Sequence, residues 1–220
     1  MIVPGIVSED DIVKLITQDN LSDEPTLKAY IEVKVYDNVG HIVQHYRQAM
    51  RSPTQYFLAL VSIPLAGTYS SSSSTSAQGI LTSVLGLPSQ IGTPYTANIA
   101  WNWIIQLGSG TQSYSPTLTS LAAPISNGTG AGQLSYGSVS VGYSSNTIST
   151  YIVVTNNSGS AITVTEIGLI GTVYIYYYNS SGNFTSNSYT FLLTYDTLSS
   201  PVTLNPGYVA TFEVILQFSG

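Results

Sequence analysis

The segment YIEVKVY, residues 30–36, decides the fold class of this chain. Its apolar side chains (Ile31, Val33, Val35) alternate strictly with charged ones. A period of two places the apolar side chains on one face, which predicts a strand with one buried and one solvent-facing side. The turn sequence DNVG at residues 37–40 follows, so we expect residues 41–44 to return as the second strand of a hairpin.

The same kind of pattern continues toward the C-terminus. Clusters of Gly, Pro, Asn and Ser bound seven further apolar segments, which we predict to be strands: 96–107, 132–143, 150–155, 161–168, 172–178, 188–194 and 208–218. Short strands at this spacing indicate an all-β chain, specifically an antiparallel β-sandwich of jelly-roll-like type. The turn before the last strand is expected between Pro201 and Gly207.

Helical signals precede the strand-rich part. Ser8, with Asp11 three residues later, stands before apolar residues at helical spacing, which predicts a short capped helix. Residues 52–55 offer an N-cap, a proline at the first helical position and a capping-box glutamine, so a second short helix is expected to end near Pro64.

This organisation predicts one short arm and one domain. Residues 1–28 are expected to form an N-terminal arm with its helix, and residues 29–220 a single β-sandwich domain. The serine-rich run at residues 70–76 has no apolar side chains to bury, so residues 69–78 are expected to be a flexible loop.

Charge is distributed very unevenly along the chain. All five basic side chains and eight of the eleven acidic ones precede Ser52, and only Glu166, Asp196 and Glu213 carry charge after it. A nucleic-acid partner is not expected, because binding phosphates requires Lys and Arg side chains. A nearly uncharged surface has little self-repulsion, which favours association with copies of the same chain.

Other compositional features bear on location. The chain has no cysteine, so neither disulfides nor thiolate metal sites are expected. No apolar run approaches the about 20 residues of a membrane span, so membrane insertion is not expected. Residues 1–11 lack the features of a secretory signal, which favours a virion component over a secreted pilin; a chain matured from a longer precursor would remove this argument.

Few residues are suited to chemistry. In the strand-rich part, Glu213 is expected to face solvent, and Glu166 and Asp196 to accept hydrogen bonds from backbone amides in turns. We therefore expect no catalytic residues and no enzyme activity. His41 and His45 lack the further ligands of a metal site, and the glycine-rich turns lack the lysine of a phosphate loop, so no metal or cofactor is expected.

Aromatic and apolar side chains are the remaining candidates for contacts. Two tryptophans lie two residues apart on a predicted strand, where burial in the core is the alternative to glycan contact. Alternate tyrosines on another strand are suited to subunit or glycan contact, and an apolar N-terminal tip either docks on a neighbouring subunit or folds onto its own domain. The glycan-contact candidates are Trp101 and Trp103, and the interface candidates are Ile2, Val3, Ile6, Val7, Tyr174, Tyr176 and Tyr178.

Several asparagines stand in Asn-X-Ser/Thr sequons. Such sequons also arise by chance in a chain rich in Ser, Thr and Asn. On a host that glycosylates its proteins, the candidate acceptors are Asn127, Asn156, Asn179 and Asn183. A further sequon begins at Asn20.

Three blocks of sequence resemble structural proteins predicted for tailed phages and archaeal viruses. The first combines residues 37–40 with RSPTQYFL at 51–58, the second combines 105–111, 121–125 and 128–136, and the third combines 157–169 with 196–207. They occur in the expected order over residues 30–218. The chain departs from the pattern at Tyr195, where a basic residue usually precedes the aspartate.

The resemblance implies a β-sandwich on the virion surface, of turret, tail or fibre type, and it implies no catalytic residues. The composition, rich in Ser, Thr, Asn and Tyr and free of cysteine, also resembles that of proteins from viruses that infect archaea in hot acid. We therefore expect a virion structural protein that assembles with itself and with other virion proteins, with host surface glycans as further partners. The alternatives are a glycan-binding adhesin and a subunit of an archaeal cell-surface appendage.

Overall fold

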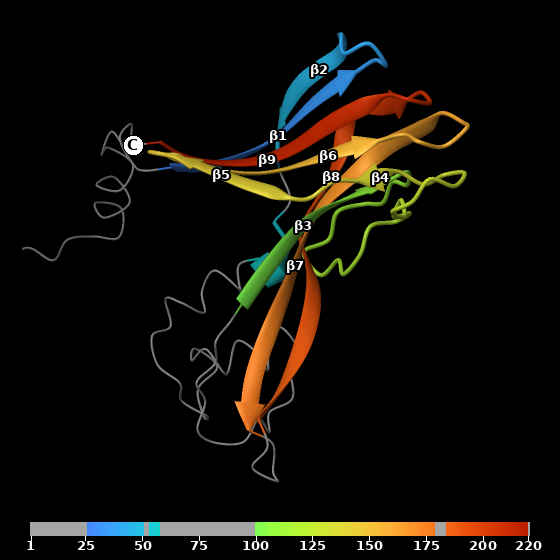
Figure 1. Ribbon diagram of the computed structural model, residues 1–220. Helices are drawn as coiled ribbons and strands as arrows, with labels where there is room; N and C mark the ends of the chain where they lie inside the picture. The colour runs from blue at the N-terminus through green and yellow to red at the C-terminus, as the bar shows by residue number, and fades with distance from the viewer. Residues whose placement is uncertain (1–25, 51–52, 58–99, 179–183, 220) are drawn as a thin grey trace, which may run out of the picture.

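The computed structural model describes residues 26–50, 53–57, 100–178 and 184–219, and it is all-β as predicted (Figure 1). Nine strands form nearly all of the regular structure in these ranges. The strands are Thr26–Tyr36 (β1), Ile42–Ala49 (β2), Ala100–Gly108 (β3), Ser135–Tyr136 (β4), Ser140–Ser144 (β5), Thr147–Thr155 (β6), Ile162–Tyr178 (β7), Phe184–Leu204 (β8) and Val209–Ser219 (β9).

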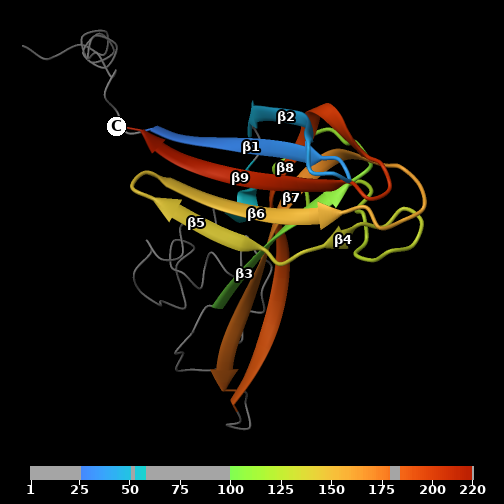
Figure 2. The same cartoon turned by 45° about the horizontal axis from the view of Figure 1, so that its top comes forward.

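These strands form two antiparallel sheets. In the larger sheet β2, β1, β9 and β6 lie side by side, and β4 and β5 both pair with the remaining edge of β6. The smaller sheet has the order β3–β7–β8. Figures 1 and 2 show the smaller sheet crossing beneath the larger one, with the far half of the β7–β8 hairpin extending away from it.

The segment that predicted the fold class behaves as expected. Ile31, Val33 and Val35 are at most 1% exposed, because this face of β1 packs into the hydrophobic core. The predicted turn also forms: the Asp37 carboxylate accepts hydrogen bonds from the backbone of Val39 and His41, and Gly40 adopts a φ of 89°. That positive φ is a conformation in which glycine has no steric penalty.

The hydrophobic core lies between the two sheets. The larger sheet contributes alternate residues of β1, β6 and β9, such as Phe212, and the smaller sheet contributes residues such as Leu169 and Leu204. A second, smaller cluster covers the other face of the smaller sheet, where Leu121 packs on Ile170. The two clusters lie on opposite faces of β7, and residues 166–171 of this strand are accordingly buried on both faces.

A bulge in β8 links the two sheets along one edge. Four residues of β8, 198–201, lie opposite the single residue Thr165 of β7, between the pairs Glu166–Thr197 and Val164–Val202. The β2 side chains reach this bulge: Gln48 donates to Thr197 O (3.0 Å) and accepts from Ser199 N (2.7 Å), and Tyr46 donates to Ser200 O (2.9 Å). Backbone groups that leave the β7–β8 ladder at the bulge are thereby satisfied by the other sheet.

Two predicted boundaries in this region are wrong. Residues 161–168 and 172–178 form one strand, β7, and the glycines between them mark close packing: a Cβ on Gly168 would lie 2.6 Å from Leu192, and one on Gly171 would lie 2.7 Å from Leu193. Pro201 belongs to β8 rather than to the turn, and the following turn is formed by residues 205–208, where Tyr208 N donates to Asn205 O.

The start of the second predicted helix also needs correction. Pro53 forms an isolated bridge with Thr194, and helical structure begins at Gln55 and is described only to Phe57. The buried Thr54 donates its hydroxyl to Leu192 O (2.6 Å) and its N–H to Leu193 O (2.8 Å), so this segment extends the edge of the smaller sheet. Residues 26–28, the end of the predicted arm, belong to β1. The rest of the arm with its helix, the helix end near Pro64 and the serine-rich loop at 69–78 lie outside the described residues.

Candidate interaction surface

Glu166 is a structural carboxylate. Its side chain is fully buried, and its two oxygens accept hydrogen bonds from the backbone N–H groups of Ala122 (3.1 Å) and Ala123 (2.8 Å). Gly108 lies directly against the carboxylate, with no space for a Cβ. The prediction that Glu166 serves backbone amides is confirmed. The carboxylate fixes the 121–123 segment against the outer face of the smaller sheet.

The strand register separates Glu166 from Asp196. Glu166 is opposite Thr197, whereas Asp196 is opposite Ile167, so the two acidic side chains point to opposite faces of the smaller sheet. Asp196 is 6% exposed and lines a cleft of about 280 Å³ with Gln48, Gln112 and Ser199. Two carboxylates on opposite faces of a sheet do not share a substrate, so they do not form an acid–base pair.

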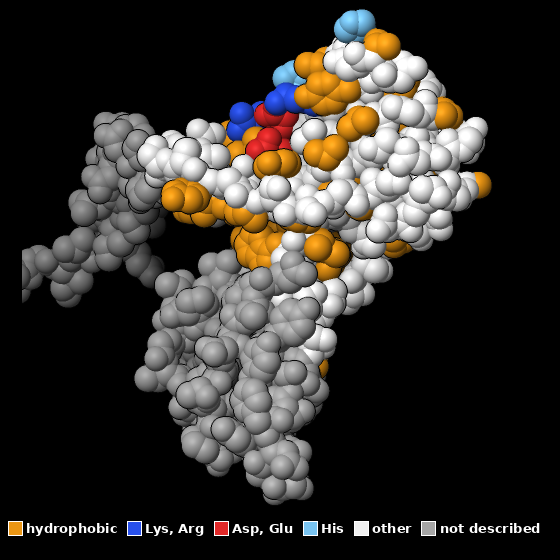
Figure 3. Space-filling view, in the orientation of Figure 1, with side chains coloured by type: hydrophobic (Ala, Val, Ile, Leu, Met, Phe, Trp, Pro, Cys, Tyr) orange, Lys and Arg blue, Asp and Glu red, His pale blue; other side chains and the backbone are white. Residues whose placement is uncertain are grey.

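The charged side chains that remain accessible gather on the outer face of the larger sheet (Figure 3). The Lys34 ammonium lies 2.6 Å from the Glu32 carboxylate, which His45 also contacts at 3.1 Å. The hydrogen bond from Lys34 lowers the pKa of Glu32, and Glu32 in turn raises the pKa of Lys34. On the same face, the Arg47 guanidinium lies 4.0 Å from the centre of the Tyr30 ring.

Away from this charged face, the described surface is nearly uncharged. After Ser52 the chain carries three charges, and two of them, Glu166 and Asp196, are buried. The third, Glu213, lies half-buried opposite Glu32 on the charged face. Between residues 100 and 219, Glu213 is therefore the only charged side chain that substantially meets solvent.

His41 and His45 contact different acidic side chains. His41 contacts Asp37 (3.3 Å) at the β1–β2 turn, whereas His45 contacts Glu32 on the charged face. Throughout the described ranges, no three His, Cys, Asp or Glu side chains form a group that could hold a metal ion.

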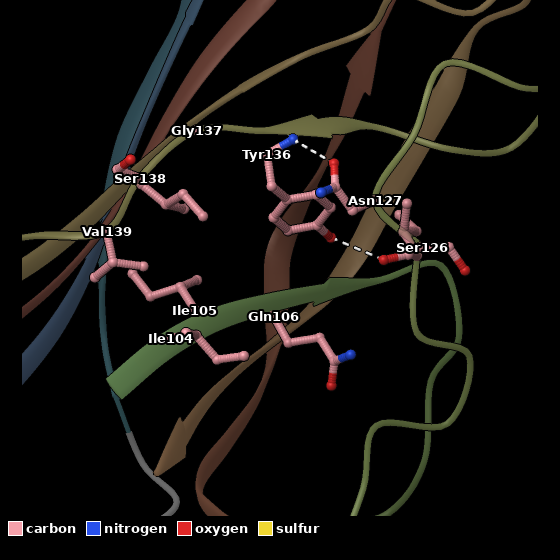
Figure 4. Close-up of a pocket in the computed structure, with 11 residues that line it drawn as sticks. Ile104, Ile105, Gln106, Ser126, Asn127, Tyr136, Gly137, Ser138 and Val139 are labelled. Atoms are coloured by element: carbon pink, nitrogen blue, oxygen red, sulfur yellow. Dashed lines mark hydrogen bonds between the residues drawn. The ribbon is translucent and has the colours of Figure 1, made fainter. Parts of the chain in front are cut away.

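A cleft of about 530 Å³ opens between the edges of the two sheets, where β3 faces β4 and residues 137–139 (Figure 4). Ile104, Ile105 and Val139 line one part of it, and Asn127 and Tyr136 the other. Tyr136 donates its hydroxyl to Ile125 O (3.0 Å), and its N–H donates to Asn127 Oδ1 (3.1 Å). Burial raises the pKa of Tyr136 to about 12, although the Leu107 N–H opposes this rise.

An exposed apolar strip lies on the larger sheet. The strip continues the core-facing side of the sheet past the end of the smaller sheet, because Val141 is opposite the buried Thr150, and Tyr143 is opposite Ile148. Figures 1 and 2 show this end of β5, β6 and β9 extending beyond β3. The exposed fractions of the strip residues are 65% for Val141, 89% for Tyr143, 40% for Ile148 and 48% for Phe218.

The sequence candidates for contacts occupy different places. Trp103 is half-buried and packs against the core. Burial in the core is the alternative to glycan contact for this residue. The backbone positions of Trp101, Tyr174, Tyr176 and Tyr178 are described, the first on β3 and the others on the extended part of β7, but their side chains lie outside the described set. Ile2, Val3, Ile6 and Val7 also lie outside it. No local signal singled out the apolar strip, because its residues come from three strands.

The sequons differ in their surroundings. Asn127 is exposed, so it stays a candidate acceptor for N-glycosylation. Asn156, by contrast, has a fully buried side chain in the folded chain, and its amide donates to Ser160 O (2.8 Å) and Leu204 O (2.7 Å). An amide that orders the 156–160 loop in this way is not accessible for modification. Asn20, Asn179 and Asn183 lie outside the described residues.

In the described part of the chain, no helix has the length and apolar character needed to span a membrane. Comparison of the chain with protein-family models, with curated proteins and with solved structures found no match, so its function is argued from the surface itself.

Proposed function

We propose that this chain is a structural protein of the virion surface, a self-assembling subunit of a turret, tail or filament with a role in host attachment. Its fold is interpreted as a jelly-roll-like β-sandwich, an interpretation that the core enclosed between two antiparallel sheets supports. Its partners are copies of itself, other virion proteins and host surface glycans.

One observation carries this proposal: an apolar strip that is 40–89% exposed lies on the face of the larger sheet opposite its charged face. Apolar surface of this kind is stabilised by a partner, because burying it removes it from water. Near-zero charge removes the repulsion that keeps ordinary soluble monomers apart. The charged face on the other side of the same sheet gives each subunit two unlike surfaces.

The accessible chemistry agrees with a structural role rather than an enzymatic one. Both oxygens of Glu166 are occupied by backbone amides, and Asp196 points to the opposite face of its sheet. A structural role needs only a surface that a partner can cover, which the apolar strip provides.

Sedimentation velocity and electron microscopy of the purified chain test self-assembly. We expect the average mass to rise with concentration and discrete oligomers or filaments to be visible. Monomers alone at high concentration would overturn the proposal. Antibodies against the chain are expected to label intact virus particles, and labelling of cellular filaments instead would support the appendage alternative.

The cleft between β3 and β4 favours the adhesin as a second candidate function. It combines apolar side chains with the amide of Asn127, a pairing suited to sugar rings and their hydroxyls. A glycan array would support it if binding is lost in Ile104→Ala and retained in Val39→Ala, an exposed residue that does not line the cleft. Absence of binding on the array would eliminate it.

A further inference from the structure

Strand β5 forms one edge of the larger sheet. Among the described strands it pairs only with β6, with an unshifted register from Ser140–Tyr151 to Ser144–Thr147. In an antiparallel pair the backbone N–H and C=O groups of alternate residues point away from the partner. The outer side of β5 therefore presents backbone groups that are suited to pair with another strand.

The two edges of this sheet differ in how they are protected against such pairing. The opposite edge, β2, carries Arg47 and His45, and the β1–β2 ladder is irregular next to Tyr36. Charged residues and bulges are the features by which edge strands avoid pairing with other chains. Strand β5, with the sequence SVGYS, has neither a charge nor a proline, and its ladder has no bulge.

The β5 sequence is also complementary to itself. A twofold axis through Gly142 would pair β5 with its copy in an antiparallel register, with serines opposite serines at the ends and each Val141 opposite the Tyr143 of the other copy. A β-branched residue opposite an aromatic one is a favourable cross-strand pair. Gly142, at the centre, adds no side chain that would separate the strands.

We propose that two copies of this chain associate through β5, forming one continuous sheet across a twofold axis, with Val141 of each copy opposite Tyr143 of the other. This inference rests on the proposed self-assembly and identifies its first contact. Pairing brings the two apolar strips together, because Val141 and Tyr143 lie on the same side as Ile148. The two most exposed residues of the strip then become buried.

A second occupant of this edge has to be distinguished experimentally. The apolar segment at residues 2–7 could instead pair with β5, but Pro4 interrupts its backbone donors. Strand β5 of a second copy is uninterrupted and matches in register, so it is the occupant to which the proposal commits.

The first experiment uses like charges at the edge. In the double variant Val141→Lys/Tyr143→Lys, each lysine is opposite a lysine of the second copy. We expect the dissociation constant of the dimer to rise at least about tenfold, since two favourable pairs become two repulsive ones. The control is Val39→Lys, a residue 70% exposed at the β1–β2 turn, which should dimerise like the original chain. Circular dichroism checks that each variant is folded.

The second experiment tests the register with cysteines, which the chain otherwise lacks. Oxidation of a mixture of Val141→Cys and Tyr143→Cys chains should give a disulfide-linked dimer, because opposite residues in paired strands are within disulfide reach. Each variant oxidised alone should give much less of the disulfide-linked dimer, because residue 141 is opposite residue 143 and each cysteine then lacks a cysteine opposite it. Equal cross-linking in all three samples would contradict the register and the twofold axis through Gly142.

The outcomes separate this inference from the proposed function. Assembly that is unchanged in the double lysine variant overturns the β5 contact and leaves self-assembly standing. An original chain that remains monomeric overturns both. Dimers lost on removal of residues 1–12 but retained in the lysine variant would show that the N-terminal segment makes the contact, and would overturn the pairing of β5 with β5.

Discussion

The carboxylate of Glu166 lies against the backbone of Gly108 so closely that any side chain at position 108 would displace it. The same carboxylate receives the N–H groups of Ala122 and Ala123. This contact couples β3, β7 and the 121–123 segment in a site without solvent.

The Gly108→Ala variant should therefore be strongly destabilised. The new methyl group forces Glu166 away from its two donors and leaves a buried carboxylate poorly satisfied, at a cost of about 2–4 kcal/mol. Urea denaturation measures the loss. Gly159→Ala is the matched control, because a Cβ there meets no atom within 4 Å, and a similar loss in both variants would contradict the role of Glu166.

The link between the sheets at the β8 bulge can be tested with two glutamines of one strand. Gln48 makes hydrogen bonds of 3.0 and 2.7 Å to the bulge, whereas those of Gln44 are both 3.4 Å. We expect Gln48→Ala to lower the free energy of unfolding by about 1–2 kcal/mol, and Gln44→Ala to lower it by less. Equal losses in urea denaturation would show that the bulge is not held by Gln48.

Asn156 should not tolerate a charge. In Asn156→Asp, the two amide N–H groups that serve Ser160 O and Leu204 O are lost, and a carboxylate is buried beside carbonyl oxygens. A destabilisation of about 3 kcal/mol or more is expected from thermal or urea unfolding. The neighbouring Asn157→Asp is the control, because Asn157 is exposed, and its change should be small.

High pH should destabilise the fold through two tyrosines. Burial raises the pKa of Tyr46 and Tyr136 from 10.0 to about 12. Below pH 10 both states keep these protons; between pH 10 and 12 the unfolded chain releases them first, so stability falls as the pH rises. Urea denaturation across this range should show the fall, and the double variant Tyr46→Phe/Tyr136→Phe should show a smaller one.

The local sequence pattern was sufficient to predict that the chain forms strands and that most of its surface carries little charge. Alternation over residues 30–36 predicts both the strand and its buried face, because a period of two is a property of the strand itself. The position of the charges in the sequence likewise predicts a nearly uncharged body. The role of Glu166 also followed, since an isolated acid in an uncharged chain needs hydrogen-bond donors.

Where strands end and which polar groups are buried were decided by tertiary contacts. Gly168 and Gly171 look like strand ends in the sequence, but they are inside β7, where leucines of β8 leave no room for side chains. Asn156 looks like an exposed acceptor, but strands far apart in the sequence enclose it. The apolar strip and the β5 edge arise in the same way, because exposure depends on which strands meet: Val141 and Phe218 adjoin one surface only once β5, β6 and β9 have paired.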